Sequence, residues 1–103
     1  MYSTDAQMVV LTVLADGPRH GYAINAAIET LTGRKLGPGS LYGALTRLEA
    51  RGLIEPVVDD AGGQERQRTM RITEEGRESL RAELEQLSRV ARAGLRALGA
   101  EPA

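Results

Sequence analysis

The sequence contains no cysteine, tryptophan or phenylalanine, and its only aromatic residues are three tyrosines. The absence of cysteine excludes disulfide bonds and thiolate metal sites, and it fits a cytoplasmic location. No apolar run is long enough to span a bilayer, and no basic segment followed by an apolar one marks a signal peptide. We therefore expect a soluble, cytoplasmic protein without a membrane partner.

Residues for a catalytic or metal centre are also missing. His20 is the single histidine, and no second histidine or cysteine could share a metal ion with it. A capping or packing role is the favoured interpretation of His20, and a ligand role is the alternative. The sequence has no nucleophile–base pair, glycine-rich phosphate loop or convergent carboxylate pair. We predict no enzyme activity, no metal site and no cofactor.

What the chain does contain is typical of one small globular domain, with 103 residues, 42% hydrophobic and 26% charged. Its formal net charge of −1 gives no support by itself to a nucleic-acid partner. Between residues 34 and 71, however, seven cations and five carboxylates leave a local excess of +2.

The first half of the chain predicts two helices. The first begins near Thr4, where Thr4 and Gln7 have the spacing of a capping box, and it ends at the Asp-Gly-Pro of residues 16–18. The second runs from about residue 21 to residue 31. Its apolar residues are expected to point inward: Tyr22, Ala23, Ile24, Ala27, Ile28 and Leu31.

The segment LGPGSLYGALTRLEARGLIEP, residues 36–56, predicts a third helix. Its apolar stripe is formed by Leu41, Ala44, Leu45 and Leu48. Its other face carries Ser40, Tyr42, Gly43, Thr46 and Arg47. Small side chains allow a helix to approach a DNA groove, and hydroxyl and guanidinium groups bind phosphates and base edges. With the preceding helix it forms a helix-turn-helix, although an ordinary solvated face is the alternative.

The next segment has the pattern of a β-hairpin, with β-forming residues over 53–58, a turn over 59–63 and a returning strand over 64–72. A hairpin directly after a helix-turn-helix is a wing. Arg66 and Arg68 near its tip are predicted to contact phosphate, although the acidic residues beside them leave a solubilising role open.

A helix without proline follows from Thr73, a good N-cap, to about Leu98. Its apolar positions form a heptad seam of Leu80, Leu84, Leu87, Ala91, Gly94 and Leu98, thickened by Val90 and Leu95. An exposed seam of this length is an association hazard unless it is an association surface. We predict that it forms a homodimer, the alternative being that it folds back on its own domain.

These motifs resemble the PadR family of bacterial transcriptional regulators, particularly its short members with one C-terminal helix. Residues 14–24 are similar to the family pattern L-x-x-G-P-x-H-G-Y-x-I, and residues 38–54 to P-G-[TS]-L-Y-x-A-L-x-R-L-E-x-x-G-L-I. Residues 71–76, RITEEG, match the end of the family's wing.

The resemblance implies a winged-helix homodimer that binds operator DNA and acts as a repressor released by a small-molecule effector. It also implies that Ser40, Tyr42 and Arg47 face DNA. Two departures stand out: Met70 holds a position that is commonly aromatic, and the last helix has no aromatic residue to wall a flat ligand pocket.

We therefore expect a mainly α-helical fold with a small β-hairpin. Residues 1–73 form a winged helix-turn-helix domain, 74–98 a dimerisation helix and 99–103 a frayed tail. The predicted DNA-binding residues are Lys35, Gly39, Ser40, Tyr42, Gly43, Thr46, Arg47, Arg66 and Arg68. The predicted function is sequence-specific regulation of transcription on double-stranded operator DNA. The alternative is a winged-helix module that binds a protein instead of DNA.

Overall fold

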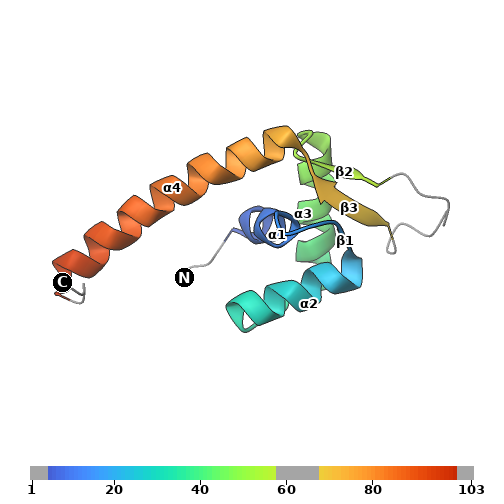
Figure 1. Cartoon of the computed structure of the whole chain (residues 1–103). Helices are drawn as coiled ribbons and strands as arrows, with labels where there is room; N and C mark the ends of the chain where they lie inside the picture. Colours follow the sequence, from blue (N-terminus) through green and yellow to red (C-terminus); the bar gives the residue numbers. More distant parts are fainter. Residues whose placement is uncertain (1–4, 58–67, 100–103) are drawn as a thin grey trace.

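The computed structural model describes residues 5–57 and 68–99, and it shows a mainly helical fold with a small antiparallel sheet (Figure 1). Figure 1 shows α1 at the centre of the domain and α4 extending away from it. The elements in chain order are α1 (Ala6–Leu14), β1 (Arg19–His20), α2 (Gly21–Thr32), α3 (Pro38–Ala50), β2 (Ile54–Pro56), β3 (Thr69–Ile72) and α4 (Glu74–Ala97).

Helix α1 is the buried centre of the core, as its nearly continuous apolar sequence predicts. Its buried residues are Val9, Val10, Leu11, Val13 and Leu14. The N-cap is Asp5 rather than the predicted Thr4, which lies outside the described residues. The Asp5 carboxylate accepts a hydrogen bond from the backbone N–H of Gln7 at 3.0 Å, so it performs the capping role itself.

Helix α2 buries a narrower face than the sequence predicts. Ile24 and Ile28 are fully buried, but the Tyr22 side chain is 82% exposed and Leu31 is also exposed. Tyr22 precedes Ile24 by two residues, which places it about 200° around the helix on the opposite face. Leu31 lies in the last turn, at the margin of the core. The prediction that both point inward is therefore wrong.

The sheet has three antiparallel strands in the order β1–β3–β2. Met70 lies opposite Arg19 of β1 and Pro56 of β2, and Ile72 lies opposite Ile54. Met70 and Ile72 are buried on the core face, as expected for a half-buried strand. In the described residues the returning strand begins at Thr69, and the predicted positions 64–67 lie outside them.

Helix α4 begins inside the domain and then leaves it. Leu80 is only 5% exposed and belongs to the core of its own domain, so its assignment to a partner-facing seam is wrong. Beyond it α4 projects outward, which gives the molecule a longest dimension of 53 Å.

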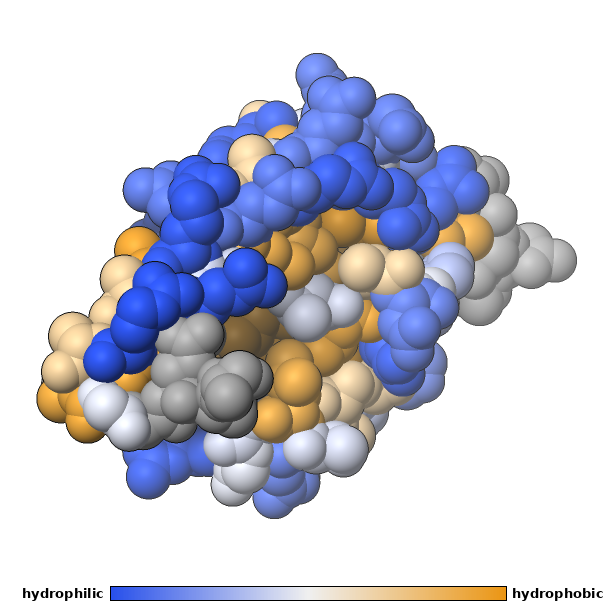
Figure 2. Space-filling model, turned by 60° about the vertical axis from the view of Figure 1, so that its left-hand side comes forward, coloured by the Kyte–Doolittle hydropathy of each residue, from blue (hydrophilic) through white to orange (hydrophobic). Residues whose placement is uncertain are grey.

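In Figure 2, apolar residues gather in a hollow bordered by hydrophilic ones. No helix in the described part of the chain is long and apolar enough to cross a membrane.

Candidate nucleic-acid interface

Helix α3 presents one face to the core and the other to solvent, largely as predicted. Leu41, Ala44 and Leu48 are buried against α1 and the sheet. Leu45, which was expected in the same stripe, is only half-buried, because it lines an open cleft beside the wing. The outward face holds the predicted α3 residues: Gly39, Ser40, Thr46 and Arg47 are exposed, and Tyr42 and Gly43 are half-buried.

The absence of a side chain at Gly43 leaves room for Arg47 on the outward face. A Cβ added at Gly43 would lie 3.3 Å from Nη1 of Arg47, so the guanidinium lies along this part of the helix. The Thr46 hydroxyl donates to the Tyr42 carbonyl at 2.9 Å and keeps its acceptor lone pairs. Within residues 5–57 and 68–99, Arg47 forms no ion pair with a carboxylate.

The one carboxylate of α3, Glu49, is paired with the wing. Its Oε2 atom lies 2.9 Å from Nη2 of Arg68, and both side chains are partly exposed. The pair neutralises the negative charge at the end of the helix, and it directs the Arg68 guanidinium toward α3. Arg66, the second predicted wing contact, lies outside the described residues.

A cleft of about 390 Å³ separates α3 from the wing. It is lined by Gly21, Tyr42, Leu45, Thr46, Glu49, Arg68 and Met70. Two of the predicted DNA-facing residues of α3, Tyr42 and Thr46, therefore share one concave surface with Arg68.

The turn between α2 and α3 is held by an asparagine that sequence reasoning did not identify. The Asn25 amide donates to the Leu36 carbonyl at 2.8 Å and accepts from the Leu36 N–H at 2.9 Å. This two-bond contact positions the start of α3 and the exposed cations Arg34 and Lys35 that precede it. Gly33 ends α2 in the left-handed conformation, with φ of 88°.

The exposed position of Tyr22 is a second feature that sequence reasoning missed, since this residue was expected to point inward. Together with Tyr42, Tyr22 borders a shallow hollow of about 290 Å³ at the junction of α2 and α3. The phenol ring is therefore placed beside the exposed face of α3. Its position two residues before the buried Ile24 was the signal in the sequence that could have identified it.

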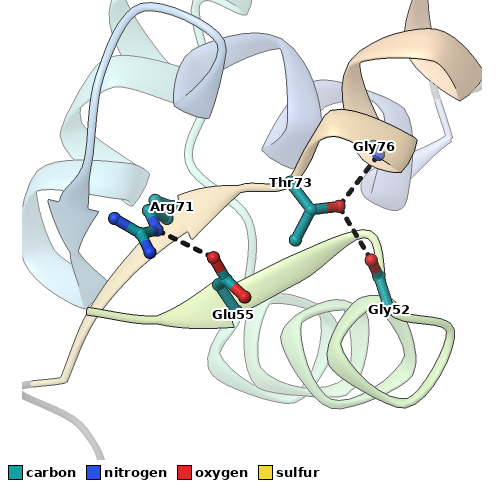
Figure 3. Close-up of polar contacts among 5 residues, drawn as sticks. All are labelled: Gly52, Glu55, Arg71, Thr73 and Gly76. Carbon is teal, nitrogen blue, oxygen red and sulfur yellow. Dashed lines mark hydrogen bonds and ion pairs between the residues drawn. The ribbon is translucent and has the colours of Figure 1, made fainter. Parts of the chain in front are cut away.

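The C-terminal end of α3 is joined directly to the start of α4 (Figure 3). Gly52, with φ of 76°, ends α3 in a Schellman motif, in which Leu53 N–H donates to Leu48 O at 3.0 Å. The Thr73 hydroxyl donates to the Gly52 carbonyl at 2.8 Å and accepts from the Gly76 N–H at 3.0 Å. In the sheet beside it, Arg71 and Glu55 form an ion pair at 2.9 Å.

The part of α4 beyond Leu80 exposes the rest of the predicted seam. Its large apolar residues are all partly or largely exposed: Leu84, Leu87, Val90, Leu95 and Leu98. Ala91 and Gly94 lie among them and are also exposed. The remaining seam therefore starts at Leu84.

In the part of the chain that the structure describes, no group of three or more histidine, cysteine, aspartate or glutamate residues could hold a metal ion. His20 is exposed and stands at the N-cap position of α2 without a capping side-chain hydrogen bond.

Comparison with known proteins gives consistent matches. Residues 10–82 match the Transcriptional regulator PadR-like family. An uncharacterized 37.1 kDa protein in transposon Tn4556 of Streptomyces fradiae is 54% identical over 90 residues, 87% of this chain and 25% of that protein. The chain thus spans about a quarter of the length of this relative.

Solved structures also match over nearly their full length. A transcriptional regulator from Clostridium thermocellum has a TM-score of 0.74 and 27% identity, covering 93% of this chain and 97% of that one. A PadR-like transcriptional regulator from Bacillus cereus has a TM-score of 0.77 and 20% identity over 92% of each chain, which shows the same fold. The fold, the motifs and the family match agree, and the chain belongs to the PadR-like family of transcriptional regulators.

Proposed function

We propose that the chain is a sequence-specific DNA-binding regulator that acts as a homodimer, with α3 entering the major groove. The observation that carries this proposal is the composition of the exposed face of α3. Up to residue 48 this face has small, hydroxyl-bearing and cationic side chains, and Glu49 in the last turn is neutralised by Arg68. Such a face can lie close to base edges without repelling the phosphates.

Neighbouring groups extend the proposed interface on both sides of α3. Arg34 and Lys35 are exposed in the connector before the helix, where they can reach phosphates of one strand. Tyr22 lies across a shallow hollow from Tyr42. On the other side, the cleft beside the wing holds the Arg68 guanidinium near the end of α3.

The proposed homodimer rests on the exposed seam of α4 and on the distribution of its charges. Residues 74–85 include five glutamates and two arginines, a net charge of −3, whereas residues 86–97 include three arginines and no carboxylate, a net charge of +3. If two α4 helices pair in antiparallel orientation, the acidic half of one faces the basic half of the other. A second copy of the chain therefore matches this surface in both apolarity and charge.

DNA binding and dimerisation support each other geometrically. Two copies of α3 can occupy successive major-groove half-sites only if they are held roughly 34 Å apart, one turn of the duplex, or a multiple of that distance. Helix α4 is the element that projects from the domain and is long enough to connect them.

We further propose that the regulator is a repressor released by a small-molecule effector. Ala91 and Gly94 interrupt the leucines of the seam, and a Cβ added at Gly94 would meet no atom within 4 Å of it in the protomer. Paired α4 helices would leave room there for a small apolar ligand. Such a ligand can release the regulator from DNA only if it binds more tightly to a dimer geometry that does not fit the operator than to the geometry that does.

Two experiments test the proposed function. Genomic fragments bound by the full chain should share a palindromic sequence, and binding to that duplex should weaken steeply with salt, with a slope of about −0.9 per phosphate contact. If no duplex binds, or if binding to DNA is independent of salt, the proposal fails and the alternative, a winged-helix module that binds a protein, is favoured.

A further inference from the structure

Hydrogen bonds connect the C-terminal end of α3 to the start of α4. Gly52 and Thr73 are 21 positions apart in the sequence, on either side of the wing, yet a hydrogen bond of 2.8 Å joins them (Figure 3). A second bond at 3.0 Å connects the Thr73 N–H to the Leu53 carbonyl. The end of α3 is thus tied to the start of α4 without passing through the wing.

Gly76 allows the two segments of this junction to pack closely as well as to form hydrogen bonds. A Cβ at this position would overlap the carbonyl oxygen of Leu53 and lie 2.8 Å from Cγ1 of Ile72. Glycine therefore allows the first turn of α4 to lie directly on the backbone that follows α3. Thr73 and Gly76 together leave little freedom for α4 to rotate relative to α3.

We propose that Thr73 is a positioning residue that sets the separation of the two α3 helices, and thereby the half-site spacing that the regulator accepts. This inference rests on the proposed DNA-binding homodimer. Helix α4 has 24 residues and is therefore about 36 Å long. A rotation of about 5° at its base displaces its far end by about 3 Å, close to the roughly 3.4 Å rise of one base pair.

The Thr73 hydroxyl has two separable roles, because it both accepts and donates. It accepts from the Gly76 N–H as the N-cap of α4, and it donates to the Gly52 carbonyl across the junction. Thr73→Asp retains an N-cap acceptor but removes the donor, since an ionised carboxylate has no proton to give. Thr73→Ser retains both roles and is the matched control.

The test uses the full chain and a palindrome that the wild-type protein selects from a pool of random duplexes. Affinity is measured for this duplex, for versions with the half-sites one or two base pairs closer or farther apart, and for a duplex with a single half-site. Wild type and Thr73→Ser should share one optimum. Thr73→Asp should shift that optimum by about one base pair or lose the preference, with single half-site affinity within about twofold of wild type.

The same data distinguish the ways in which the inference can fail. If Thr73→Asp keeps the wild-type optimum, or if its affinity for the single half-site falls in parallel with that for paired sites, Thr73 does not set the spacing. If Thr73→Asp does not fold, Thr73→Ala takes its place. Alanine also removes the donor to the Gly52 carbonyl, so the same shift is expected. The variant should still fold, because losing a cap costs a domain only modestly. If wild type selects no duplex at all, the proposed function fails before any variant is compared.

Discussion

Replacing Leu84 and Leu87 with aspartate should dissociate the proposed dimer. In the protomer these residues are 39% and 41% exposed, so about two fifths of each remains for a partner to cover. Fully burying a leucine contributes about 1.5–3 kcal/mol, so the four leucines of a dimer contribute about 2.4–4.8 kcal/mol together. Their loss would raise the dimer dissociation constant by about 50- to 3,000-fold, before any cost of burying a carboxylate.

Sedimentation over a range of concentrations measures this constant, and thermal unfolding shows whether the protomer still folds. The matched control is Ala82→Asp with Ala93→Asp, which adds the same two charges to the opposite side of α4, about 150–170° away from the seam. The control should remain a dimer. If the Leu84→Asp, Leu87→Asp variant sediments as a dimer with the wild-type constant, the seam does not face a partner.

Three other substitutions test the proposed DNA interface and the proposed effector position. Arg47→Ala should reduce operator affinity markedly while stability stays within about 0.5 kcal/mol of wild type by thermal unfolding; unchanged binding would remove Arg47 from the interface. Asn25→Asp replaces a donor to the Leu36 carbonyl with a carboxylate oxygen, so it should cost about 1–3 kcal/mol of stability. It should also lower the ratio of operator affinity to random-duplex affinity. An unaltered ratio would contradict a role of Asn25 in positioning α3. Ala91→Leu should alter operator affinity in a binding titration without touching DNA, and wild-type affinity with wild-type effector response would refute the proposed ligand position.

The parts of the fold that follow from local chemistry could be predicted from the sequence. The alternation in β3, the cap at Thr73 and the stop at Gly52 each depend on residues close together in the chain. The outward face of α3 was predictable for the same reason, since its helical periodicity separates Leu41 and Leu48 from Ser40 and Arg47.

The features that were missed depend on contacts between distant segments. Strand β1 has two residues, too few to show a periodicity, and it exists because it pairs with β3. Asn25 bonds to a residue 11 positions away, and nothing near it in the sequence indicates that partner. Leu80 continues the heptad of α4 without interruption, and only the position of the domain shows that this leucine is already covered.

The glutamates at the start of α4, which contribute much of the negative charge of the chain, do not oppose the proposed DNA interface, because they are separated from the N-terminal part of α3 in space. Five of the 14 carboxylates lie in residues 74–85, at the start of α4. The junction at Thr73 places this start beside the C-terminal end of α3, which has 13 residues and is about 20 Å long. Exposed charges are largely screened beyond about 8–10 Å at physiological salt, so these glutamates have little effect on phosphates near Ser40. A phosphate near Ser40 is therefore affected more by nearer charges such as Arg34, Lys35 and Arg47 than by these glutamates, and the charge of the whole chain is a poor guide to the local field.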